Sequence, residues 1–160
     1  MRYKNILVPF DGSEHAKRAL EAAIDLMRDS DDAQLRVLTV VPAPAVPPET
    51  KRRRLGNASR TPVALMDMDD YAEVVMQAVD DARDDLREKM AEAIAEFGER
   101  AIPDACANLS PVDGITEYVQ SNGCDLIVMG RRGLGALRGM LGSVSYGVLR
   151  SADVPVLTVK

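Results

Sequence analysis

Residues Gly130–Ser145, GRRGLGALRGMLGSVS, form the most informative stretch of the chain and directly follow the apolar run Leu126–Met129. Five glycines fall within thirteen residues there, between that run and a segment with helical spacing. Glycine costs backbone entropy, so this density is tolerated where the backbone needs positive φ or lets a ligand approach closely. A glycine loop between a strand and a helix start exposes N–H groups beside the positive end of the helix dipole. The stretch therefore predicts a phosphate-binding loop.

Working outward from this loop, short apolar strands alternate with helical patterns along the whole chain. Strands are predicted at Ile6–Phe10, Leu35–Val41, Ala105–Leu109, Leu126–Met129 and Val154–Val159. Helices are predicted at Glu14–Arg28, Asp69–Ala101, Val112–Gln120 and Ser143–Ser151. This alternation predicts a Rossmann-like α/β fold, in which a parallel sheet carries helices on both faces. We expect one domain over residues 1–160.

Periodicity is lost only between about residues 42 and 67. Four prolines lie between positions 42 and 48, and the basic run Lys51–Arg54 follows. This composition predicts a long loop, and loops of this length tend to be functional or mobile. The basic run is interpreted as a solvated segment rather than a nucleic-acid patch, although its role stays open.

Composition narrows the class of protein. Twenty Lys and Arg residues against twenty-five Asp and Glu residues give a formal charge of −5, and there is no Trp. A net negative charge does not attract nucleic acid or acidic membranes. Few aromatic side chains are available for the bases of a single-stranded nucleic acid to stack on. No apolar stretch is long enough to cross a membrane and no signal h-region begins the chain, so we expect a cytoplasmic protein. Cys106 and Cys124 fit no disulfide framework or metal motif and are expected to be small buried residues.

Residues at strand carboxyl ends are the candidates for function, because ligands of such sheets bind there. Asp11 follows the first predicted strand, where it contacts a ligand, caps the next helix, or does both. Ser13 is the expected N-cap of that helix. His15 is the only histidine and is expected at the surface, since no Ser-His-Asp or Cys-His arrangement can be assembled around it. No catalytic residue is predicted.

Three motifs in order resemble the universal stress protein family over the whole chain. They are Val8–Ser13, Leu38–Val41 and Gly130-x-x-Gly133 followed by Gly142-Ser143, and the ending Ala152–Val159 is similar to that family's last strand. The resemblance implies the strand order 3-2-1-4-5 and a homodimer. It also implies ATP binding, which members with the glycine motif show.

The same resemblance implies the binding residues. Asp11 would hold the ribose, Pro9 and Val40 would border the adenine, and Met129 would line the pocket. The phosphates would be surrounded by Gly130, Arg132, Gly133, Gly142, Ser143, Val144 and Ser145. We expect no metal bound by protein side chains, and any Mg²⁺ would be held through the ATP phosphates.

One departure from the family pattern keeps three functions open. Nine residues usually separate the second and third motif glycines, whereas Leu134–Leu141 gives eight. Gly135 and Gly139 are flexible enough to absorb the missing residue. The first hypothesis is therefore an ATP-binding sensor or regulatory module with at most slow hydrolysis. A weak ATP-hydrolysing, adenylyl- or phosphoryl-transfer enzyme is the second, and an adaptor that has lost nucleotide binding is the third.

The last predicted strand carries an apolar edge near the C-terminus, formed by Val154, Val156 and Val159. An exposed apolar edge strand needs a partner. The sequence therefore predicts that the homodimer forms through this strand.

Overall fold

The computed structural model describes residues 3–43, 68–133 and 141–160. Five strands form one parallel sheet in the order β3-β2-β1-β4-β5. Their bounds are β1 Asn5–Pro9, β2 Gln34–Pro42, β3 Ala101–Asn108, β4 Leu126–Gly130 and β5 Val156–Val159. The predicted fold class and strand order are confirmed. Because all five strands run the same way, their carboxyl ends meet at one end of the sheet.

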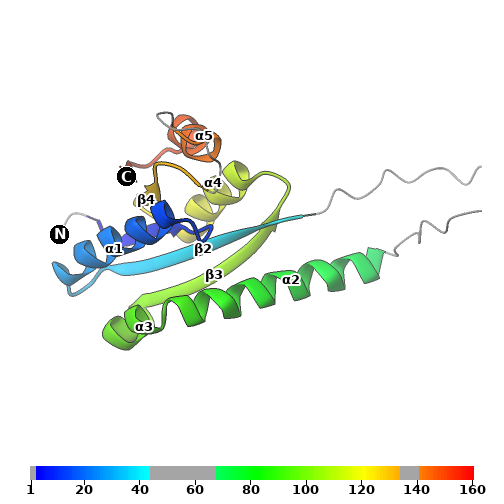
Figure 1. Ribbon diagram of the computed structural model, residues 1–160, viewed down its shortest axis with the longest axis horizontal. Coiled ribbons are helices and arrows are strands. Elements are labelled where there is room, and N and C mark those ends of the chain that lie inside the picture. The colour runs from blue at the N-terminus through cyan, green and yellow to red at the C-terminus, as the bar shows by residue number, and fades with distance from the viewer. Residues whose placement is uncertain (1–2, 44–67, 134–140) are drawn as a thin grey trace, which may run out of the picture.

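Helices cover both faces of the sheet (Figure 1). On one face lie α1 (Glu14–Arg28), α2 (Met68–Lys89) and α3 (Ala91–Phe97), which bury Met27, Leu86 and Phe97 against the sheet. On the other face lie α4 (Pro111–Asn122) and α5 (Ser143–Ser151), packed on the sheet through Ile115 and Val148. β1 and β4 bury side chains on both faces, which is why they appear in the sequence as continuous apolar runs.

Local capping explains where the helices begin and end. Ser13 accepts a hydrogen bond from Ala16 N and caps α1, as predicted. Ser110 caps α4 in the same way, by accepting from Asp113 N. Gly123 ends α4 with φ +61°, in the left-handed region that glycine adopts without strain.

The single helix predicted over Asp69–Ala101 is wrong. The helix is interrupted at Met90, where φ −96° and ψ 7° leave the helical region, and α3 begins at Ala91. Gly98 (φ +59°) ends α3, and a 3₁₀ turn, Gly98–Arg100, leads into β3. Both Leu86 and Met90 are fully buried, so the apolar spacing continued past the break and concealed it.

The bounds of the two outer strands also differ from the prediction. β3 begins at Ala101 instead of Ala105 and includes Pro103, which an edge strand tolerates although proline has no N–H to donate. β5 begins at Val156, so Val154 precedes the strand instead of belonging to it. The predicted loop over residues 42–67 lies outside the described residues from position 44 onwards, and so does its basic run Lys51–Arg54.

Candidate functional site

A cavity of about 950 Å³ lies at the carboxyl ends of the strands. Every residue that the sequence singled out for binding lines it: Pro9, Asp11, Val40, Met129, Gly130, Arg132, Gly133, Gly142, Ser143, Val144 and Ser145. These residues come from β1, β2, β4, the glycine loop and α5, which are far apart in the sequence. The topology therefore brings the three motifs to one place.

Sequence reasoning missed the rest of the cavity wall. Its additional members are Phe10, Ala16, Leu38, Thr39, Pro111, Ile115, Leu141 and Tyr146. Pro111 and Ile115 belong to α4, which had no motif to mark it. The strand order offered one signal for α4. The loop between β3 and α4 starts at the carboxyl end of the sheet, where ligands of such folds bind, so the first residues of α4 could be expected near the cavity.

The unequal lengths of β1 and β2 leave backbone groups directed into the cavity. β1 ends at Pro9, which pairs with Leu38, and Phe10 N donates to the Leu38 carbonyl at 2.8 Å. β2 continues to Pro42 and pairs there only with β3. Residues two apart on a strand direct their N–H and C=O groups to the same side. The backbone groups of Val40 therefore face the space where β1 has ended, which is the cavity.

Asp11 holds its carboxylate at the mouth of this space. Its Oδ1 accepts from Ser13 N at 3.0 Å, and this turn fixes the carboxyl group. Asp11 is not the N-cap of α1, because Ser13 has that role. Its Oδ2 lies against Gly133, so closely that a Cβ at position 133 would collide with it. Gly133 therefore has to be glycine for the carboxylate to keep its place.

The start of α5 supplies the N–H groups that the sequence predicted. Gly142 is the N-cap, and no side chain caps the helix. The Gly142 N–H donates to the Arg131 carbonyl at 3.0 Å, which ties the two ends of the glycine loop together. The N–H groups of Ser143 and Val144 in the first turn have no acceptor within the helix. Together with the helix dipole they favour an anion at this position.

One serine hydroxyl does not have the role expected from the sequence. Ser145 is buried and its Oγ donates to the Gly130 carbonyl at 2.9 Å. A hydroxyl has one donor, so Ser145 has none left for a phosphate. It instead joins α5 to the end of β4. Gly130 is tightly enclosed as well, because a Cβ there would lie 2.8 Å from the His15 Cβ.

Few titratable side chains lie among the described residues that line the cavity. Asp11 is the only acidic side chain among the described lining residues, and His15 and both cysteines are absent from them. His15 is half-buried instead of exposed, and Cys106 is half-buried although burial was predicted. Burial raises the pKa of the Cys124 thiol to about 11, so it stays protonated at neutral pH. The described residues contain no cluster of three metal-ligating side chains.

Comparison with known proteins identifies the family. The profile of the Universal stress protein family matches residues 2–160. The chain is 30% identical over 159 residues to the universal stress protein YxiE of Bacillus subtilis, covering 99% of each chain. The chain therefore belongs to the universal stress protein family, as its motifs predicted.

Solved structures agree with the fold. The universal stress protein UspA from Lactobacillus plantarum superposes with a TM-score of 0.70 at 25% identity, covering 100% of this chain and 99% of that one. A universal stress protein in complex with cAMP has a TM-score of 0.60 at 26% identity, covering 98% of this chain and 96% of that one. No helix within the described ranges is long and apolar enough to cross a membrane.

Proposed function

We propose that this chain is an ATP-binding sensor or regulatory module of the cytoplasm, with its nucleotide site in the cavity at the carboxyl ends of the strands. One observation carries the proposal: a largely apolar cavity joins the open backbone edge at Val40 to the uncapped first turn of α5. An adenine nucleotide has the matching chemistry, an apolar base with polar edges at one end and phosphates at the other. The cAMP complex of a relative supports this ligand class.

Each part of the nucleotide has a chemical counterpart in the cavity. The base fits between Pro9 and Val40, where the Val40 backbone offers a donor and an acceptor to its edges. The Asp11 Oδ2 faces the cavity mouth and accepts from a ribose hydroxyl, while Oδ1 is already held by Ser13. The phosphates fit at the N-terminus of α5, near Gly142 and Ser143.

Regulation by binding is favoured over turnover, because Asp11 is the only candidate general base among the described lining residues. Its proposed contact with ribose places it away from the phosphates. We therefore expect at most slow hydrolysis. Mg²⁺ would be held through the phosphates.

Isothermal titration calorimetry with ATP tests this function. Asp11→Ala should weaken ATP binding by about 1–3 kcal/mol, the effect of losing a hydrogen bond to a charged group. Asp29→Ala, at the far end of α1, is the matched control and should bind like the wild-type chain. An unchanged dissociation constant in Asp11→Ala would mean that Asp11 serves only to accept the hydrogen bond from Ser13 N in the turn before α1.

An adaptor without nucleotide is the alternative, and the eight-residue spacing of the glycine motif is the observation that favours it. Gly135 and Gly139 lie outside the described residues. A wild-type chain that binds neither ATP, AMP nor cAMP in the same titrations would rule out the proposed nucleotide site and leave the adaptor as the remaining candidate.

We further propose a homodimer through β5. β5 is the outer strand of the sheet, and Leu157 on it is 43% exposed. Val154, Val156 and Val159 are half-buried against the two cores, so Leu157 offers more apolar surface to a partner than they do. Leu157→Lys should give monomers in sedimentation velocity, and a persistent dimer would place the interface elsewhere.

A further inference from the structure

Two helices contribute to the wall of the cavity and also contact each other. α4 contributes Pro111 and Ile115 to the wall, and α5 contributes Val144 and Tyr146. Within the contact between the helices, Gly147 faces Val112 closely, and neither residue lines the cavity. Val112 follows Pro111 directly, and Gly147 follows Tyr146 directly. A change in this contact therefore moves wall residues on both helices.

Gly147 is an unfavourable residue at its position unless close packing requires it. It lies in the middle of α5, where glycine is less favourable than alanine. Its φ is not positive, so the backbone does not need glycine there. Space is what requires it: a Cβ at position 147 would lie 2.6 Å from Val112 Cγ2 and 3.3 Å from Cγ1. Gly147 therefore permits α4 and α5 to approach more closely than any other residue would.

A second glycine seats α4 on the sheet. A Cβ at Gly114 would lie 3.0 Å from Cγ1 of Val40, which lines the cavity next to the open backbone edge. α4 is thus held close to β2 on one side and close to α5 on the other. The distance across the cavity is set by these contacts, because helices transmit a displacement along their length with little deformation.

We infer that Gly147 and Val112 are positioning residues, which set the width of the nucleotide cavity from outside it. This inference rests on the proposed function and adds a specificity determinant to it. An added methyl group at position 147 forces α4 and α5 apart by roughly an ångström, because ordinary carbon contacts begin near 3.4 Å. Ile115 on α4 then moves relative to Pro9 and Val40, between which we place the base.

The chain offers a compensating change, so the test is a double-mutant cycle with ATP affinity as its readout. Gly147→Ala should weaken ATP binding about tenfold through lost close contacts. Val112→Ala removes both γ carbons and leaves only Cβ, 3.5 Å from the added methyl group. The double variant should therefore bind ATP within about twofold of Val112→Ala alone. Additive losses, with no rescue, would overturn the inference.

Stability and hydrogen exchange make the result independent of nucleotide binding. In a helix with free space around it, Gly147→Ala would raise the melting temperature, since alanine is the better helix former. We expect instead a lower melting temperature and faster amide exchange over residues 111–122, both reversed by Val112→Ala. A raised melting temperature with unchanged exchange would overturn the inference. A wild-type chain that binds no nucleotide would overturn the proposed function, and exchange would still decide whether this contact positions α4.

Discussion

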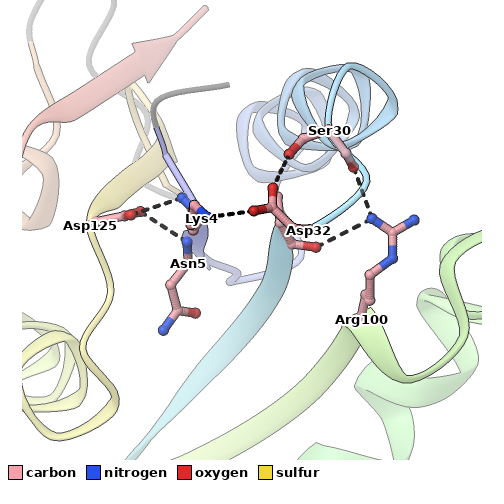
Figure 2. A network of polar contacts seen from close by, with 7 residues as sticks. Lys4, Asn5, Ser30, Asp32, Arg100 and Asp125 are labelled. Carbon is pink, nitrogen blue, oxygen red and sulfur yellow. Dashed lines mark hydrogen bonds and ion pairs between the residues drawn. The ribbon is translucent and has the colours of Figure 1, made fainter.

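The two ends of the sheet differ in whether their backbone N–H and C=O groups have hydrogen-bond partners. At the amino end, a network joins β1 to the loops before β2 and β4 (Figure 2). Asp125 accepts from Lys4 N at 2.8 Å and from Asn5 N at 2.9 Å, and Lys4 Nζ forms an ion pair with Asp32. Arg100 donates to the Ser30 carbonyl at 2.9 Å. At this end, side chains form hydrogen bonds with backbone groups that have no partner in a neighbouring strand.

At the carboxyl end, comparable backbone groups are left open. The first turn of α5 has no side-chain cap, and the backbone edge of Val40 has no strand beside it on the β1 side. Val40 and Val144 are half-buried and Ser143 is exposed, so water or a ligand can reach these groups and complete their hydrogen bonds. The comparison teaches that side chains complete the backbone hydrogen bonds at the amino end, whereas the carboxyl end keeps open the groups to which we assign the proposed ligand.

The largest effect on the carboxyl end is expected from filling the space next to Gly133 with a side chain. Gly133→Val puts a branched side chain where the Asp11 carboxylate lies. Nucleotide affinity should fall more than a hundredfold, about 3 kcal/mol, because the carboxylate and the loop cannot both keep their places. Since Gly133 is exposed at the end of the sheet, the melting temperature should change little. Calorimetry and thermal unfolding measure both, and retained affinity would show that the carboxylate moves aside freely.

The opposite outcome is expected at the amino end. Asp125→Ala leaves the half-buried Asn5 N–H without its acceptor, which should lower the free energy of unfolding by about 1–3 kcal/mol. Nucleotide affinity of the folded protein should not change, since Asp125 lies across the sheet from the cavity. Urea unfolding and calorimetry test the two halves of this prediction. The exposed ion pair is the control, and Asp32→Ala should have a smaller effect on unfolding.

A smaller and pH-dependent effect is expected from Tyr118, on the helix that forms one cavity wall. Its hydroxyl donates to Asp104 at 2.8 Å, and burial followed by that hydrogen bond raises the Tyr118 pKa to about 12, from 10.0. The raised pKa means that its contribution to stability is present below pH 10 and is lost as the pH rises from 10 towards 12.

Tyr118→Phe removes the titrating group and should flatten the loss of unfolding free energy over that range. Urea unfolding of the two chains at several pH values measures the difference. Tyr146→Phe is the matched control, because the Tyr146 side chain is mostly exposed. Parallel curves for Tyr118→Phe and the wild-type chain would contradict the prediction.

Local signals made most of the fold predictable. β1 and β4 are buried on both faces and therefore appear as unbroken apolar runs, and Ser13 and Gly123 mark helix ends through their own hydrogen-bonding and backbone chemistry. The break at Met90 was not predictable, because the residues on both sides of it are buried in the same core. Apolar periodicity reports burial and is insensitive to a small change in helix direction.

The binding residues were predictable only where a motif marked them. Pro111 and Ile115 complete the cavity through the packing of α4, which is set by contacts distant in sequence. The hydrogen bond from the Ser145 hydroxyl to the Gly130 carbonyl could not be predicted either, since fifteen positions separate the two residues. The sequence pattern shows which residue types gather at a loop, and tertiary packing decides which of their atoms remain available.

No lining residue of the cavity comes from the described part of the chain between Ala43 and Ser110, which contains α2, α3 and β3. This block packs against one edge and one face of the sheet (Figure 1). Substitutions on the outward surface of this block should therefore leave the described cavity wall unchanged, because the block reaches that wall only through its packing on the sheet.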